Sequence, residues 1–285
     1  MSTMRTIEKN AILVELSISQ WTGRRYDRAS SNEFNASKKA APDASRIHKA
    51  VVDPAMLKPT SRQAYAIRRY MECNTLPWSD TGQRILPVLR LQEFRDGFET
   101  LKTEFLDEVD RFIHAYRADV RQEAARLGDL FDLSDYPSPA VVREKFDAKL
   151  KFLPIPAGDD FRVDFDADTI EMLRSELESE LATKQASILT GLWRDVGVHL
   201  TTIAERLKDP DARFRRELTD NARDLLLRIE DLNVFDDPDL AALAAESKRL
   251  CDLIKDPIQL REDGIARDMA ACEAQRIVAE FDDLW

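Results

Sequence analysis

Two long stretches of the chain repeat apolar residues every three, four or seven positions. The first runs from residue 91 to residue 127 and the second from residue 167 to residue 208. This period places the apolar side chains along one face of an α-helix, and most of the intervening positions are charged or polar. The sequence therefore predicts two long amphipathic helices, each with a single apolar stripe to bury.

The two stripes suggest that the helices cover each other. A helix with one apolar stripe is not stable alone in water, and the two predicted helices are of similar length. We therefore expect an antiparallel coiled-coil hairpin in which the stripes meet. The predicted seam includes three phenylalanines of the first helix and three leucines of the second: Phe98, Phe105, Phe112, Leu177, Leu181 and Leu192.

Shorter patterns of period two predict a small β element. Residues 12–18 and 161–165 alternate between apolar and polar side chains, as a half-buried strand does. An isolated hairpin is marginal in water, so we expect the strand at 12–18 to pair with a β insert at about 150–166. Pro154 lacks the N–H that a central strand donates, which favours an edge position for its strand.

The first 90 residues carry no other long pattern. Short helical patterns occur at 45–52 and 60–73, while residues 28–45 are rich in Ser, Asn, Ala and Lys without periodicity. We expect residues 28–45 to form a mobile arm or a long loop.

The last 75 residues return to helical patterns. A break at 236–238 separates two apolar stripes, and Asp237 followed by Pro238 is typical of a helix start. A final acidic helix is expected at about 259–284. The predicted fold is thus mainly α, with three parts: a basic N-terminal strand, arm and short helices (1–90), the coiled-coil hairpin with its β insert (91–208) and a C-terminal helical bundle (209–285).

Composition agrees with a helical, globular protein. The 285 residues include only eight glycines, against about 20 at average usage. The sequence has no apolar run near the roughly 18 residues of a membrane span. Its three cysteines (Cys73, Cys251 and Cys272) are scattered, which favours reduced thiols and a cytoplasmic protein.

The charge is distributed unevenly. Residues 1–70 hold 13 Lys+Arg and 6 Asp+Glu, a net charge of +7, whereas the remainder carries −18. Two interpretations stay open. The basic segment can lie on acidic helices of this protein or of another copy, or it can contact nucleic acid or another acidic partner.

Cations interleaved with aromatic residues make the basic segment a candidate binding site. Such a pattern suits single-stranded nucleic acid, which is held by phosphate attraction and base stacking. Arginines also accompany Tyr65 and Tyr70 further along the chain. The candidate contact residues are Trp21, Arg24, Arg25, Tyr26, Arg28, Lys38 and Lys39.

Motifs of catalysis and cofactor binding are missing from the sequence. It has no phosphate-binding glycine loop, no nucleophile elbow and no zinc-ligand spacing. Asp110 and His114 lie one turn apart and are expected to form at most a surface pair. Three alternating aspartates ending at Asp168 lack the glycine and the glutamate of a calcium loop, since Thr169 and Ser175 occupy those positions. We expect no catalytic residues, no metal and no cofactor.

Three segments carry a family resemblance. The LSISQWTGRR segment at 16–25, the connector from 136 to 163 and the LNVFDDPDL segment at 232–240 resemble an uncharacterised family of phage, prophage and mobile-element proteins, a domain of unknown function. The resemblance implies that the gene of this protein lies near genes for MoxR-type AAA+ ATPases and von Willebrand A-domain proteins. It implies an adaptor in a phage-encoded machine of the bacterial host cell, and no catalytic residues.

These observations predict a non-enzymatic phage-type binding or assembly protein, an adaptor or scaffold that acts through helical coiled-coil surfaces. Long apolar stripes are readily completed by another copy, so self-association is expected. A phage or host protein such as an AAA+ ATPase is a second expected partner. The alternative function is a single-stranded DNA-binding or annealing factor that uses the basic N-terminal quarter.

Overall fold

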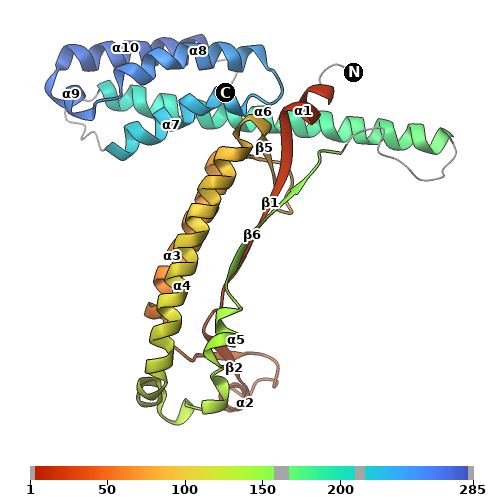
Figure 1. The fold of residues 1–285 in the computed structure, drawn as a ribbon, viewed down its shortest axis with the longest axis vertical. Helices are drawn as coiled ribbons and strands as arrows, with labels where there is room; N and C mark the ends of the chain where they lie inside the picture. Colours follow the sequence, from red (N-terminus) through yellow and green to blue (C-terminus); the bar gives the residue numbers. More distant parts are fainter. Residues whose placement is uncertain (1–3, 157–166, 209–215, 282–285) are drawn as a thin grey trace. The chain divides into compact units, whose positions relative to one another are not determined.

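The computed structural model describes residues 4–156, 167–208 and 216–281 (Figure 1). This part of the chain is mainly helical, with a small antiparallel sheet, as the sequence predicts. The helices are α1 (Met4–Asn10), α2 (Arg28–Ser37), α3 (Lys58–Asn74), α4 (Leu91–Leu127), α5 (Pro139–Arg143), α6 (Ala167–Lys208), α7 (Arg216–Leu232), α8 (Pro238–Leu253), α9 (Pro257–Glu262) and α10 (Gly264–Glu280). The strands are β1 (Ala11–Ser19), β2 (Arg24–Asp27), β3 (Ile47–Ala50), β4 (Leu76–Pro77), β5 (Gln83–Pro87) and β6 (Asp147–Leu153).

The chain forms two compact units, each built from separate stretches of sequence. Unit 1 comprises Met1–Glu15, Cys73–Gln92 and Lys151–Trp285, and unit 2 comprises Leu16–Glu72 and Glu93–Leu150. The boundaries fall inside β1, α3, α4 and β6. This division differs from the predicted one at residues 90 and 208, because the two long helices belong to different units.

The larger sheet has the strand order β4-β5-β1-β6. β1 and β5 are antiparallel, with Ala11 opposite Pro87 and Glu15 opposite Gln83. The predicted strand at 12–18 is confirmed as β1, and β6, the strand beside it, begins within the predicted connector. The second predicted strand, at 161–165, lies outside the described residues. β4 and β5 were not predicted, since both are short and contain or adjoin prolines.

Unit 2 has an aromatic core around α4. Phe98, Phe105 and Phe112 are buried there together with Ala64 and Ile67 of α3. Their spacing of seven residues keeps them on one helix face, as the stripe predicts. Val142 and Phe146, which surround the end of α5, complete this core.

Unit 1 has a mainly aliphatic core formed by α6, α7, α8 and α10. Leu181 and Leu192 of α6 are buried in it with Ile229 of α7 and Ile277 of α10, and Leu177 packs against it half-buried. α6 contacts both α7 and α10 in this unit. The second long stripe is therefore covered by the C-terminal helices.

The predicted pairing of the two long helices is not confirmed. Their bounds at 91–127 and 167–208 agree with α4 and α6. However, the seam residues of α4 lie in the core of unit 2, and those of α6 lie in the core of unit 1. A periodic stripe indicates which face is buried but does not identify the side chains that cover it.

Three shorter predictions also need correction. Residues 28–45, expected as a mobile arm or a long loop, form α2 followed by a loop with ordered turns. The helical pattern at 45–52 contains β3 instead, and the helix expected at 259–284 is divided into α9 and α10 by Asp263, which caps α10. None of the described helices is long and apolar enough to cross a membrane.

Candidate interaction surface

The basic N-terminal segment is organised as a small β2–α2–β3 module in unit 2. Asp27 ends β2 and caps α2, accepting a hydrogen bond from the Ser30 N–H at 2.9 Å. This bond lowers the pKa of the Asp27 carboxyl, as does the nearby Lys49 ammonium. The buried Ser31 hydroxyl donates to the Asp27 carbonyl and accepts from the Ile47 N–H at 2.9 Å, which fastens α2 to β3.

Asn35 orders the turn that follows α2. Its side-chain amide donates to the carbonyls of Pro42, at 2.9 Å, and Ser45, at 3.1 Å. The Ser45 hydroxyl donates back to the Asn35 side-chain oxygen. Asn35 is buried, so these bonds satisfy its polar atoms inside the module. Polar side chains, rather than an apolar stripe, order this segment, which explains why its pattern did not predict a helix.

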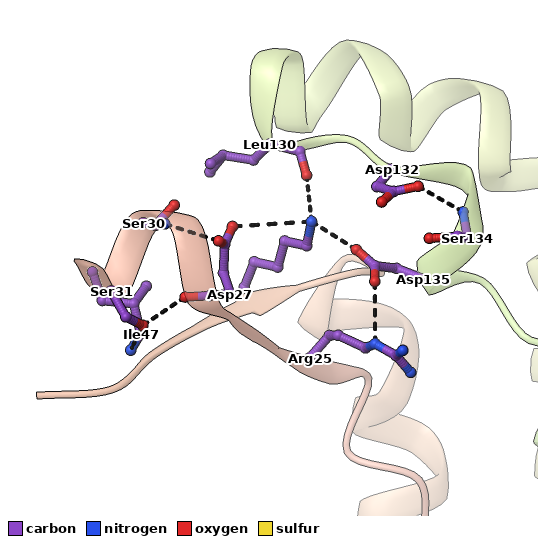
Figure 2. A network of polar contacts seen from close by, with 10 residues as sticks. Arg25, Asp27, Ser30, Ser31, Ile47, Leu130, Asp132, Ser134 and Asp135 are labelled. Carbon is purple, nitrogen blue, oxygen red and sulfur yellow. Dashed lines mark hydrogen bonds and ion pairs between the residues drawn. The ribbon is translucent and has the colours of Figure 1, made fainter. Parts of the chain in front are cut away.

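Lys49 of β3 joins the module to the loop after α4. Figure 2 shows Leu130 and Asp135 of this loop beside Asp27 and Arg25 of the module. Its ammonium lies 2.6 Å from the Asp135 carboxylate and 2.7 Å from the Leu130 carbonyl, and 4.0 Å from Asp27. The Lys49 side chain is only 10% exposed. Arg25 pairs with the same Asp135 at 3.1 Å. Two cations of the basic segment are thus paired within unit 2.

A second attachment point is the buried carboxylate of Glu123 on α4. It accepts the Asp53 N–H at 2.8 Å and the Arg126 guanidinium at 2.5 Å, and it is 3% exposed. Arg126 also donates to the Ala50 carbonyl. Burial, with a contribution from Glu123, raises the pKa of the nearby Tyr136 to about 12, so its phenol stays neutral. Glu123 was not singled out in the sequence, because nothing in a helical run of charged residues marks the one that is buried.

The aromatic candidates differ in accessibility. Trp21 lies against Phe112 and Tyr116, with ring centroids 6.1 Å and 5.5 Å away, and packs on the unit 2 core. Tyr26 is 43% exposed, with its ring 5.7 Å from that of His48. Of the two predicted stacking residues, Tyr26 alone is largely open to a base.

The other cationic candidates are exposed. Arg24, Arg28, Lys38 and Lys39 all lie on the surface of the module, and none forms an ion pair with a described residue. Lys38 lies over the Phe34 ring at 5.9 Å. The structure therefore divides the predicted site into residues that hold the module together and residues that face solvent.

A second basic surface lies on α3. Lys58, Arg62, Tyr65 and Arg69 follow one another at intervals of four, three and four residues and are all exposed. We call these four residues the α3 stripe. Tyr65 is 62% exposed, whereas Tyr70 stacks on Phe94 at 5.4 Å. The stripe lies opposite the buried face of α3, and its three cations have no ion-pair partner among the described residues.

The two units differ in charge. Unit 2 contains 20 Lys+Arg and 19 Asp+Glu, and unit 1 contains 22 and 34, so their net charges are +1 and −12. Many acidic residues of unit 1 remain on its surface. The first half of α6 exposes a row spaced four residues apart, which we call the α6 row: Asp168, Met172, Glu176 and Glu180.

The residues considered for catalysis or metal binding lie apart. Among the described residues, no group of three or more His, Cys, Asp and Glu side chains could hold a metal ion. Asp110 of α4 pairs with Arg143, the last residue of α5. Asp168 is an exposed residue of the first turn of α6, and the two preceding aspartates of that motif lie outside the described residues. Burial raises the pKa of the Cys251 thiol to about 11, which leaves it protonated and unreactive.

Comparison with known proteins identifies the family. No curated protein and no solved structure matches the chain. Residues 9–244 match the family described as "Protein of unknown function (DUF3150)". This match covers most of the chain and includes the β2–α2–β3 module, the α3 stripe and the α6 row. The chain therefore belongs to the DUF3150 family of proteins of unknown function.

Proposed function

We propose that this chain is a non-enzymatic assembly protein that associates with other copies of itself through exposed helical faces. The α3 stripe is the observation that carries the proposal. It presents three cations and a largely exposed tyrosine on one rigid helix. Tyrosine and arginine are enriched in protein interfaces, where they supply contact area and directed hydrogen bonds.

The packing of the charged residues supports a binding role. Arg25, Lys49 and Glu123 hold unit 2 together. The cations of the α3 stripe contribute nothing comparable to the fold. A helical face that is not used in folding is available to a partner. The family resemblance adds one expected partner, a phage or host protein such as an AAA+ ATPase.

Light scattering tests the proposal. The mass of the purified protein should rise with concentration above the 32.6 kDa of one chain. Because charged faces are proposed to carry the contact, the rise should be larger in low salt, about 0.05 M, than in about 0.5 M. A mass that stays at 32.6 kDa under all these conditions would contradict self-association.

Single-stranded DNA binding is the second candidate. It is favoured by the exposed Arg24, Arg28, Lys38 and Lys39, which lie on the same module as the accessible Tyr26. Replacing Arg24 and Arg28 by Ser should weaken binding to a fluorescent oligonucleotide. The slope of log K against log salt should flatten by about 0.7 for each phosphate that the variant no longer neutralises. Replacing Arg194 and Arg267 of unit 1 by Ser provides the control. If the wild-type protein does not bind the oligonucleotide even at low salt, single-stranded DNA binding is wrong.

A further inference from the structure

We infer that the α3 stripe of one copy binds the α6 row of a second copy, with the two helices antiparallel. This inference rests on the proposed self-association and names its two faces. The α3 stripe contains cation, cation, tyrosine and cation in the order Lys58, Arg62, Tyr65 and Arg69. Read in reverse, the α6 row contains acid, acid, methionine and acid in the order Glu180, Glu176, Met172 and Asp168.

The spacing of the two faces agrees. At about 1.5 Å per residue, Lys58 and Arg62 are about 6 Å apart along α3, and Glu180 and Glu176 are about 6 Å apart along α6. Over their full lengths the stripe spans about 16.5 Å and the row about 18 Å. Antiparallel helices can therefore place every cation of the stripe beside an acid of the row.

The central position matches in chemistry as well. Tyr65 and Met172 are the uncharged members of the two sets, and they are 62% and 54% exposed. In this register they face each other. A thioether beside an aromatic ring is a favourable contact, and both side chains would lose exposed apolar surface.

Both faces are free to take part. Neither the cations of the stripe nor Glu176 has an ion-pair partner among the described residues, and Glu180 pairs there only with Lys184, one turn away on the surface. Such exposed pairs contribute little to stability, so Glu180 can exchange its partner at small cost. The acidic row repels nucleic acid and attracts basic surfaces. The stripe of a second copy is such a basic surface, which favours a second copy as the partner.

Each copy carries one stripe and one row, so the contact joins two different surfaces. Contacts of this kind either close into a small symmetric assembly or continue from copy to copy. A variant with a damaged stripe still has an intact row, and the reverse holds for a variant with a damaged row. Two damaged variants can therefore complement each other.

The test uses two double variants of the full chain and light scattering in low salt. Arg62→Gln with Arg69→Gln removes two positive charges from the stripe. Glu176→Gln with Glu180→Gln removes two negative charges from the row. Each variant alone should lose at least tenfold in association constant, since two ion pairs are removed. An equimolar mixture should form a heterodimer of about 65 kDa, twice the mass of one chain.

Two control variants change the same number of charges at neighbouring places. Glu171→Gln with Glu178→Gln alters another side of α6, and Lys38→Gln with Lys39→Gln alters the exposed end of α2. Both should associate like the wild type. All substitutions are at exposed positions, and unchanged circular dichroism and melting temperature will show that the variants fold.

The outcomes separate the two proposals. If the wild type associates but the stripe and row variants behave like the controls, the stripe–row contact is wrong while self-association stands. If the wild type remains a monomer at every concentration, both are wrong. If its mass rises only when an oligonucleotide is added, association depends on nucleic acid and not on the row, and the inference is overturned.

Discussion

The two units of this protein use charged residues in opposite ways. Unit 2 brings Lys49, Arg25 and Glu123 into its structure and has a net charge of +1. Unit 1 has an aliphatic core, a net charge of −12 and an acidic surface. The basic first quarter of the sequence does not form a basic domain, because the fold combines it with the acidic stretch Glu93–Leu150. A charge asymmetry along a sequence is therefore a poor guide to the charge of a folded unit until its partner segments are known.

The largest expected effect is in the core of unit 2. Phe105→Asp places an unpaired charge among buried rings and should lower the free energy of unfolding by more than about 4 kcal/mol. Glu104→Asp, at the neighbouring exposed position, should cost less than about 0.5 kcal/mol. Thermal melts followed by circular dichroism compare the two. Equal melting temperatures would show that the buried face of α4 is wrongly assigned.

Removing the buried carboxylate of unit 2 should have the next largest effect. Glu123→Ala leaves the Asp53 N–H and the Arg126 guanidinium without their acceptor, and should cost about 3 kcal/mol. Glu108→Ala, which removes a surface pair with Arg111, should cost at most about 1 kcal/mol. Urea unfolding measures both. Similar losses would mean that Glu123 is no more important than a surface acid.

Two glycines in long helices allow a direct comparison of the units. A Cβ at Gly97 on α4 would overlap the hydroxyl of Tyr70, whose ring is held by its stacking on Phe94. A Cβ at Gly191 on α6 meets nothing within 4 Å. Gly97→Ala should therefore destabilise the protein by about 1–2 kcal/mol, whereas Gly191→Ala should stabilise it by up to about 1 kcal/mol. Chemical denaturation will give the sign of each change; the same sign for both would refute the assigned close approach of Tyr70 to α4.

The smallest effect concerns the cap of α2 and depends on pH. The pKa of Asp27 is lowered in the folded state, so its contribution is present above its unfolded pKa of about 3.9 and is lost as the pH falls through the folded value. Asp27→Ala should cost about 1 kcal/mol at neutral pH, and the difference from wild type should shrink below about pH 4. Urea unfolding across this pH range provides the measurement, with Asp43→Ala, an exposed aspartate of the same segment, as the control. If the difference in free energy of unfolding between wild type and Asp27→Ala stays constant with pH, the effect of the substitution comes from packing and not from the carboxylate charge.

What could be predicted from the sequence follows from the kind of force that forms each element. The bounds of α4 and α6 and the cap at Asp237 were predictable, because an apolar period and a capping side chain are local signals. The α2 segment was missed, since its order depends on hydrogen bonds of Asn35 to residues up to ten positions away. The partner of each long helix was equally hidden, because a stripe of Leu and Phe fits many apolar faces.

The candidate interaction surface could be predicted only in part from the sequence, for a related reason. The sequence shows which residues are cationic but not which of them are neutralised. Lys49 and Lys39 look alike in the chain, yet Lys49 is half-buried beside two carboxylates and Lys39 is exposed. The partner of Lys49, Asp135, lies 86 residues away in the sequence.

The position of β1 between β5 and β6 affects how the protein is made. β6 leaves the ribosome more than 120 residues after β1, which at about 5–20 residues per second is a delay of roughly 6–25 s. During this interval one edge of β1 lacks its neighbour and can pair with strands of other nascent chains. Contacts between residues so distant in sequence also slow folding after synthesis. Neither unit is a continuous piece of chain, and unit 1 takes segments from both sides of unit 2, so a cut at any position between residues 15 and 151 separates parts of unit 1 from one another.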